Sequence, residues 1–201
     1  MTKELVFNYY NSNDFESIIQ SLDSSIKITI YNKSGKNLGR YSNEIICENI
    51  GREGHTYLFH IIENYDTLSD ITAFMQDDFF NHLFNYEYFI NNFNNNINEM
   101  FYQFPCSWRI GDGVSTLSRT VKNGYLDLFT MPNNFSIREF SEKFNIHLPV
   151  IYQTETCAHF MVSKERIHKH PKKLYQDLLE WLLSDERNGY TLEHCWKILF
   201  M

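Results

Sequence analysis

The sequence predicts a single α/β domain in which helices cover a mostly parallel β-sheet. The chain has 201 residues, which is typical of one domain. Hydrophobic residues make up 43% of it and charged residues 21%, so there is enough apolar side chain for a core. Strand-like and helix-like segments alternate along the first third, as they do in proteins with parallel sheets.

The first two segments show this alternation clearly. Leu5–Tyr10 is an apolar run that is typical of a buried strand. Asp14–Leu22 carries apolar residues at helical spacing, and Asp14 is a suitable N-cap. The segments that follow are predicted as a strand at Ile26–Tyr31, a loop at Asn32–Asn43, a short strand at Ile45–Cys47, a helix at Gly54–Tyr65 and a buried strand at Ile71–Met75.

The rest of the chain has weaker patterns. Asn91–Asn98 is rich in asparagine and fits a loop or a polar helix face equally well. Phe101–Tyr125 contains a proline and three glycines and is predicted to be irregular. The last segments are predicted as a helix at Ser136–Phe144, a strand at Ala158–Ser163, a helix at Pro171–Leu183 and a closing helix at Leu192–Phe200.

Charge and cysteine spacing exclude several classes of protein. The net charge of −7 gives no overall basic field for nucleic acid, so we expect no nucleic-acid partner. We expect neither a signal peptide nor a transmembrane segment, because no apolar run is long enough for either. The four cysteines lie far apart, which disfavours zinc and predicts reduced thiols in a cytoplasmic protein. They are Cys47, Cys106, Cys157 and Cys195.

Ligands of parallel sheets bind beyond the carboxyl ends of the strands, so the polar residues there are the first candidates for a site. Asp77 and Asp78 directly follow a buried strand. An acid pair at this position is able to hold a hard divalent cation that bridges a diphosphate. The competing interpretation is an ordinary solvated loop.

The turn before the second predicted helix is another candidate. Gly51 and Arg52 lie at this helix N-terminus, where free N–H groups and the helix dipole favour an anion. Arg52 would add a bidentate contact to phosphate. The alternative is a turn with an exposed Arg–Glu pair.

Glu193 lies near the start of the closing helix, and a carboxylate there is a candidate general base. The competing interpretation is an acidic residue that only stabilises the first turn of that helix.

Several long segments resemble a family of proteins of unknown function that occurs in fungi, bacteria and large DNA viruses. One is ENIGREGHTYL at residues 48–58, followed by HIIENYDTLSDITAFMQDDFFNH at residues 60–82. Another is AHFMVSKERIHKHPKKLYQDLLEWLL at residues 158–183, and GYTLEHCWKILF resembles the family's C-terminal end. The resemblance runs from about Tyr31 to Phe200 and is weakest between Asn85 and Gln153.

This family resembles glycosyltransferases of the GT-A fold, a Rossmann-like fold. The order of Asn49–Gly51, a helix, and a strand that ends at Asp77-Asp78 is similar to the order in those enzymes. The resemblance implies a nucleotide-sugar-binding half at residues 1–84 and an acceptor-side half at residues 85–201. It implies a transferase that moves a sugar from a nucleotide-diphosphate sugar, with a UDP-sugar favoured, to a glycan or glycoprotein, in the host cytoplasm if the protein is viral.

The implied roles fall into three groups. Glu193 would be the catalytic base, and Asp77 and Asp78 would hold Mn²⁺ or Mg²⁺. The residues that would bind the donor are Tyr10, Asn32, Lys33, Gly51, Arg52, His55 and Gln76.

Some positions depart from the family pattern. Asp77 replaces a glycine, Asn81 replaces an aspartate and His159 replaces a glutamine. A non-catalytic nucleotide-sugar- or carbohydrate-binding module would fit the departures at Asp77 and Asn81. A phosphate-transfer enzyme fits less well, because the chain has no Walker-type glycine loop.

Overall fold

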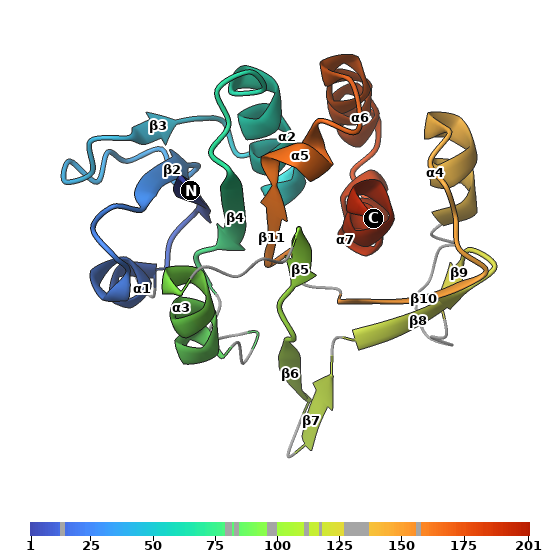
Figure 1. The fold of residues 1–201 in the computed structure, drawn as a ribbon, viewed down its shortest axis with the longest axis horizontal. Coiled ribbons are helices and arrows are strands. Elements are labelled where there is room, and N and C mark those ends of the chain that lie inside the picture. The colour runs from blue at the N-terminus through green and yellow to red at the C-terminus, as the bar shows by residue number, and fades with distance from the viewer. Residues whose placement is uncertain are drawn as a thin grey trace.

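The computed structural model describes residues 1–12, 15–78, 82, 85–95, 100–110, 113–116, 118–126, 137–155 and 158–201. Within these ranges a six-stranded sheet lies between two layers of helices (Figure 1). This arrangement confirms the predicted α/β class and is consistent with a Rossmann-like fold. No helix in the described ranges combines the length and the apolar character that a membrane crossing needs.

The main sheet contains β1 (Lys3–Tyr9), β2 (Lys27–Asn32), β3 (Glu44–Ile46), β4 (Ile71–Gln76), β5 (Phe101–Gln103) and β11 (Phe160–Ser163). The helices are α1 (Phe15–Ser21), α2 (Arg52–Glu63), α3 (Tyr86–Asn94), α4 (Ile137–Phe144), α5 (Lys164–Ile167), α6 (Lys172–Ser184) and α7 (Arg187–Phe200). The remaining strands are β6 (Ser107–Ile110), β7 (Gly113–Thr116), β8 (Ser118–Lys122), β9 (Tyr125–Leu126) and β10 (Ile151–Glu155).

The strand order in the main sheet is β3-β2-β1-β4-β11-β5. The first four strands in this order run parallel, with β1 between β2 and β4. β11 pairs antiparallel with both β4 and β5. The carboxyl ends of β1, β2 and β4 therefore meet at one edge of the sheet, which we call the carboxyl edge.

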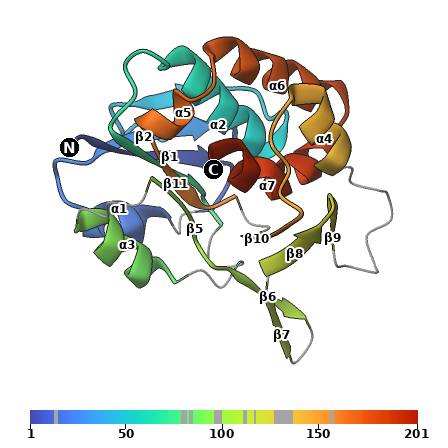
Figure 2. The ribbon, with the colours of Figure 1, turned by 45° about the vertical axis from the view of Figure 1, so that its right-hand side comes forward.

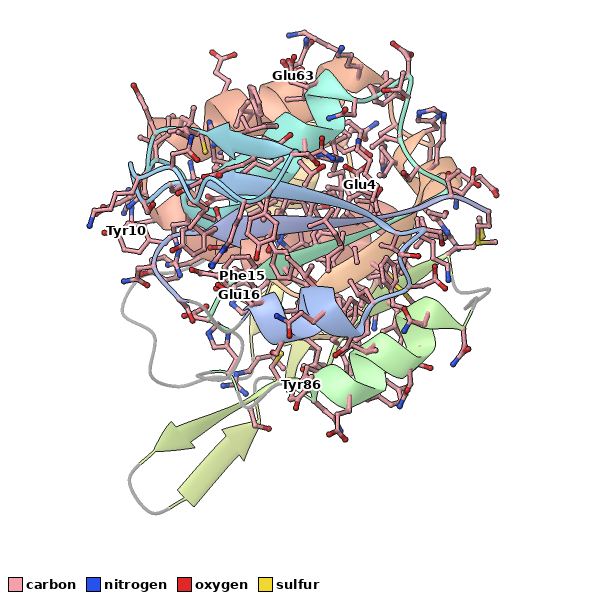
Figure 3. All side chains as sticks on the ribbon, turned by 90° about the vertical axis from the view of Figure 1, so that its left-hand side faces the viewer. Glu4, Tyr10, Phe15, Glu16, Glu63 and Tyr86 are labelled. Atoms are coloured by element: carbon pink, nitrogen blue, oxygen red, sulfur yellow. The ribbon has the colours of Figure 1, made fainter. Side chains whose placement is uncertain are left out.

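Each face of the sheet has its own hydrophobic cluster, because side chains alternate along a strand. On β1, Val6 belongs to the cluster under α2, α6 and α7, whereas Leu5 and Phe7 belong to the cluster under α1 and α3. Figure 3 shows α1 and α3 together on one side of the sheet and Tyr10 at the end of β1. The predicted elements of the first third are thus confirmed, although Asp14 lies outside the described residues.

One later prediction needs correction, and two others are refined. β11 forms in the predicted Ala158–Ser163 segment and runs antiparallel to β4, which agrees with a sheet that is mostly parallel. The closing helix α7 begins at Arg187 rather than at Leu192, since Arg187–Thr191 continues the helix without a break. The first part of Asn91–Asn98 is helical, because Phe93 and other apolar side chains of α3 are buried.

The expectation of irregular structure in Phe101–Tyr125 is wrong. β5 joins the main sheet, β6 and β7 form a hairpin, and β8 pairs with β9 and β10. Figure 2 shows the β6–β7 hairpin extending away from the body of the molecule. These strands have two to five residues each, too short for an alternating pattern to be recognised.

The expectation of four reduced thiols is also wrong, because Cys106 is disulfide-bonded. Cys47 and Cys195 are free. Cys157 lies outside the described residues.

Candidate active site

Most of the residues predicted for the site meet at the carboxyl edge. The end of β1 and the first residue after β4 are joined there by a hydrogen bond from the backbone N–H of Asp77 to the carbonyl of Asn8, at 3.2 Å. The residue after β2, Lys33, donates its backbone N–H to the carbonyl of Tyr9 at 2.8 Å. The N-terminus of α2 is tied to the same edge, because the Thr56 hydroxyl donates to Asn8 Oδ1 at 2.7 Å.

Asp77 organises the loop that follows β1. Its Oδ2 accepts backbone N–H bonds from Tyr10, Asn11 and Ser12 at 2.9, 2.9 and 2.8 Å. Burial raises the pKa of Asp77, and these three bonds oppose that rise. One oxygen of the two predicted metal-binding carboxylates, Oδ2 of Asp77, is therefore already used to hold this loop. Tyr10 itself is 48% exposed, so its ring is accessible from solvent.

Asn32 organises the loop after β2. Its side-chain amide donates to the Lys36 carbonyl and to Glu44, while its oxygen accepts from Ser34. Asn32 is completely buried. The structure therefore places this predicted donor-binding residue beneath the site, where it shapes a loop.

Lys33 supports the turn that precedes α2. Its ammonium group donates to the backbone carbonyls of Ile50, at 2.8 Å, and of Arg52. Burial lowers the pKa of Lys33 to about 8. The turn needs this support because both Gly51 and Arg52 have positive φ, 59° and 53° respectively. Since a non-glycine residue is strained in this region, the position of Arg52 is imposed by its surroundings.

Arg52 is the centre of the site. Its Nη2 lies 3.3 Å from Glu193 Oε1, and its Nε lies 3.7 Å from Glu53 Oε2. The guanidinium also stacks on the ring of Tyr190 at 4.3 Å. The Arg52 side chain is 43% exposed, so it links a buried acid pair to solvent.

Glu53 and Glu193 both lie beside the Arg52 guanidinium and form a pair of neighbouring carboxyl groups. Burial raises the pKa of Glu193 well above its usual range, and the negative charge of Glu53 adds to the rise while Arg52 opposes it. Glu193 lies in the second turn of α7, which excludes the interpretation that it stabilises the first turn.

The negative charges of four carboxyl groups, which we call the acid cluster, act on the buried phenol of Tyr57 on α2. The pKa of its phenol is raised well above the usual range, first by burial and then by the negative charges of these groups. They belong to Glu53, Asp78, Asp77 and Glu193. The structure thus brings both predicted acid sites, one from β4 and one from α7, into a single neighbourhood.

Two histidines and the end of β4 complete the site. The backbone N–H of Gln76 donates to Nδ1 of His159 at 3.4 Å. Nε2 of His159 lies 3.4 Å from Nδ1 of His82. The charges that act on His82 are those of Asp78, Glu53 and Arg52, so this pair of rings lies beside the acid cluster.

His55 lies one turn into α2 and stacks on Phe59 with ring centroids 5.8 Å apart. Burial, with the charge of Lys33 nearby, lowers its pKa to about 4, so its ring is neutral at physiological pH.

No cluster of three or more His, Cys, Asp or Glu side chains suited to a metal occurs within the ranges that the structure describes. The predicted pair Asp77 and Asp78 is adjacent in sequence, and Asp78 is partly buried.

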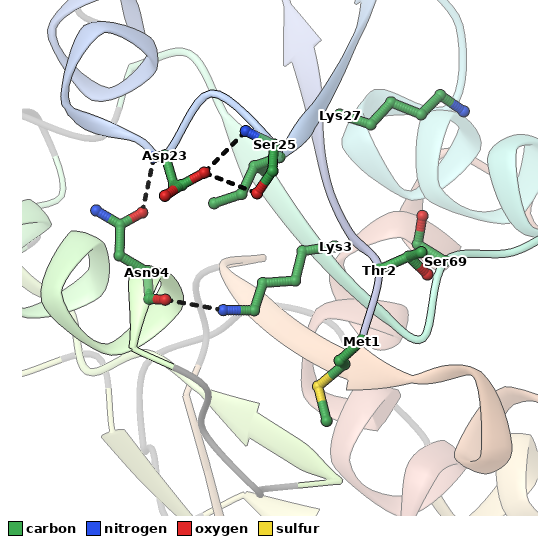
Figure 4. A pocket seen from close by; sticks show the side chains of 9 residues that line it. Met1, Thr2, Lys3, Asp23, Ser25, Lys27, Ser69 and Asn94 are labelled. Atoms are coloured by element: carbon green, nitrogen blue, oxygen red, sulfur yellow. Dashed lines mark hydrogen bonds between the residues drawn. The ribbon is translucent and has the colours of Figure 1, made fainter.

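A polar hollow lies at the opposite, amino-terminal edge of the sheet and has a volume of about 530 Å³. Figure 4 shows the side chains that line it, with Lys3 and Asp23 among them. The ammonium group of Lys3 donates to the last carbonyls of α3, at Phe93 and Asn94, so this side chain has a structural partner. The acid cluster lies at the carboxyl edge, where ligands of parallel sheets bind, and we place the candidate site there.

Three residues of this site were not among the predicted ones. Glu53 follows Arg52 directly and shows no periodic signal that separates it from a surface acid. His82 and His159 are far apart in sequence and meet only because β11 lies beside β4. The one sequence signal for His82 was a histidine that follows a predicted strand end. The sequence by itself does not show that such a histidine is buried.

These features define a class: a Rossmann-like α/β protein with an arginine, an acid cluster and a histidine pair at the carboxyl edge of its parallel strands. The family described as "Protein of unknown function (DUF3431)" matches residues 5–201, and the chain belongs to this family. A comparison with curated proteins found no match.

Proposed function

We propose that the protein is a glycosyltransferase that moves a sugar from a nucleotide-diphosphate sugar, with a UDP-sugar favoured, to a hydroxyl group of a glycan or glycoprotein. The observation that carries this proposal is the buried Glu53–Glu193 pair held by Arg52 at the carboxyl edge. The similarity of the segment order to GT-A enzymes supports it as an analogy of fold.

Glu193 would act as the general base. Because its pKa is raised, the ionised form is a stronger base than an ordinary carboxylate and suits proton abstraction from a hydroxyl. The proton would pass from the acceptor hydroxyl to Glu193 as the hydroxyl oxygen attacks the sugar carbon, and the bond from that carbon to the diphosphate oxygen would break, releasing the nucleoside diphosphate. If the enzyme inverts, one base on this face of the sugar is sufficient, by the same logic as in inverting hydrolysis.

The donor would bind along the loops that follow the strands. The exposed Tyr10 ring is suited to stack on a base, and Arg52 is suited to a phosphate oxygen. Asn32, Lys33 and Gly51 would support donor binding by shaping these loops, and His55 and Gln76 lie at their borders.

Mn²⁺ or Mg²⁺ is part of the proposal. Mg²⁺ is commonly held by one or two carboxylates together with substrate phosphates, and Asp78 with the remaining oxygen of Asp77 fits that donor set. The bound cation would offset the negative charge that develops on the leaving nucleotide.

The experiment is an assay of sugar transfer and of nucleotide-sugar hydrolysis with purified protein. A panel of nucleotide sugars is first screened by thermal shift with and without Mn²⁺, because a ligand at 100 times its Kd stabilises by about 2.7 kcal/mol. The wild type is then compared with Glu193→Gln, with Glu186→Gln as the matched control at an exposed acid before the same helix. Loss of turnover in the first variant alone supports the proposal. Equal turnover in all three proteins contradicts the role of Glu193.

A non-catalytic binding module for nucleotide sugars or carbohydrates is the second candidate. The three backbone bonds to Asp77 favour it, since they give this acid a structural role that needs no chemistry. A thermal shift with a nucleotide sugar, without hydrolysis or transfer to any acceptor, would select this candidate.

A cytoplasmic location also stays a proposal. The disulfide of Cys106 argues against a cytoplasmic location, because structural disulfides are rare in reducing compartments. Counting the free thiols of protein purified under non-reducing conditions tests whether that bond is formed in the producing cell.

A further inference from the structure

The side chain of Arg52 lies along one face of α7. The ring of Tyr190 lies with its centroid 4.3 Å from Arg52 Cζ, and Glu193 Oε1 lies 3.3 Å from Nη2. The aliphatic part of the side chain passes over Gly189, where an added Cβ would lie 3.2 Å from Cδ of Arg52. Gly189 and Tyr190 precede Glu193 by four and three residues, so both are its neighbours on the helix surface. We call these three residues of α7 the α7 face.

The α7 face reaches Arg52 because α7 and α2 pack closely. Gly189 is buried and has no side chain, which leaves room for the aliphatic part of Arg52. Gly54 has the corresponding place on α2, since an added Cβ there would lie 3.0 Å from Cδ2 of Leu192 on α7. Each glycine therefore admits a side chain of the other helix, and a larger residue at either position would separate the two helices.

The backbone of Arg52 is held independently, by the residue that follows β2. The carbonyl of Arg52 accepts a hydrogen bond from the ammonium group of Lys33, and Arg52 has φ of 53°. A non-glycine residue adopts this conformation only where its surroundings impose it. Arg52 is thus fixed at both ends, at the backbone by Lys33 and at the guanidinium by the α7 face.

An arginine side chain that is 43% exposed ordinarily samples several rotamers, and losing that freedom on binding weakens the affinity for a ligand. Contact with the face of an aromatic ring restrains a guanidinium without cancelling its charge, as a second carboxylate would. The ring of Tyr190 is therefore suited to order Arg52 while its positive charge stays available to an anion.

We propose that Tyr190 is a positioning residue that, together with Gly189, holds Arg52 in one pose against Glu193, so that the guanidinium is ordered before an oxyanion binds. The oxyanion would be a phosphate group of the donor, and this part rests on the proposed function. The ordering of Arg52 does not rest on it, because the α7 face contacts Arg52 in the free protein. Without the ring, the guanidinium would leave Glu193 and bind a phosphate more weakly, although the charge of the site would be the same.

The ordering is measured on the full chain, labelled with ¹⁵N, from the guanidinium signals of Arg52. These signals are assigned by their absence in Arg52→Lys. A held guanidinium rotates slowly about its Nε–Cζ bond and gives separate signals for its two Nη atoms, whereas a free one gives a single averaged signal. We expect separate signals in the wild type, and an averaged signal there would overturn the proposal.

Substitutions of Tyr190 test the ring. Tyr190→Leu should give the averaged signal, whereas Tyr190→Phe keeps the ring and should keep the separate signals. Tyr125→Leu is the matched control, because Tyr125 is also exposed and its ring lies 5.7 Å from Cζ of another arginine, Arg138 on α4. It should leave the Arg52 signals unchanged.

Two results with these variants would contradict the role of the ring. Separate signals in Tyr190→Leu would show that Arg52 is ordered without it. Averaged signals in Tyr190→Phe would assign the ordering to the hydroxyl group instead. If Tyr190→Leu does not fold, Tyr190→Gln replaces it, because glutamine also lacks a ring and is a good helix former.

The effect on an oxyanion is tested by calorimetry with UDP as the probe. A cation–π contact supports a change in population of about 2-fold to about 30-fold, so UDP affinity should fall by that factor in Tyr190→Leu. The affinity of Tyr125→Leu should equal that of the wild type. Equal affinity in Tyr190→Leu would overturn the ordering of Arg52 for an oxyanion. If the wild type does not bind UDP, the proposed function fails at its phosphate contact, and the guanidinium signals of the free protein still decide whether Tyr190 orders Arg52.

Discussion

Replacing Gly51 by alanine should destabilise the turn that positions Arg52. Gly51 has φ of +59°, and an alanine Cβ there would lie 2.8 Å from Cβ of His55 and 3.0 Å from Cδ2 of Leu183. The left-handed conformation costs a non-glycine residue about 1–2 kcal/mol. Overpacking in a close-packed region costs about 1–3 kcal/mol more. We therefore expect the free energy of unfolding to fall by about 2–5 kcal/mol.

Gly35→Ala is the matched control. Gly35 also has a positive φ, +73°, but no atom lies within 4 Å of the place where its Cβ would be. The Gly35→Ala variant has the conformational cost without the clash, so its free energy of unfolding should fall by about 1–2 kcal/mol. Urea unfolding followed by tryptophan fluorescence compares the two variants under one condition. Equal losses would refute the steric part of the reasoning, and no loss in either variant would refute the backbone conformation itself.

Three further predictions concern the charged groups of the site. Because the folded protein holds the Glu193 proton more tightly than the unfolded chain does, its free energy of unfolding should fall as pH rises above 4.5, the usual carboxyl value. Glu193→Gln should flatten that fall in urea titrations and should lower sugar transfer by about 10²–10⁴-fold; transfer at the wild-type rate would leave the base unidentified. Arg52→Lys keeps the charge but loses the planar fork, so calorimetry should show donor affinity weakened by about 1–3 kcal/mol, and unchanged affinity would make Arg52 a surface residue. If Asp77 and Asp78 hold a cation, donor affinity should drop in EDTA and return with Mn²⁺, whereas equal affinity in both would remove the metal from the proposal.

The parallel part of the sheet was predictable because its strands are buried and because each strand is recognisable from neighbouring residues in the sequence. β1 and β4 are apolar runs of a length typical of strands, and the segment between them contains α2 with its apolar stripe. Such patterns arise from the period of each element and from burial, and both are written in neighbouring residues.

The direction of β11 and the strands β5 to β10 were not predictable in the same way. An apolar run such as Phe160–Ser163 carries no information on whether its neighbour runs parallel or antiparallel. That choice depends on which edge of the sheet is free and on where the intervening chain returns, so it is decided by the whole fold.

The candidate site likewise contains residues that the sequence predicted and residues that only the tertiary structure brings together. Arg52 and Asp77 stand out in the sequence because Arg52 begins a helix and Asp77 follows a strand end, and both positions are local properties. Glu193 was a candidate because the closing helix was predicted to begin at Leu192, whereas α7 begins at Arg187. Their partners were decided only in three dimensions. Glu53 becomes an acid of the site because α7 packs against α2 and brings Glu193 to it, and His82 meets His159 because β11 pairs with β4 and places His159 beside Gln76. Hydrogen bonds act over about 3 Å between atoms, and only tertiary packing brings residues so distant in sequence to that separation.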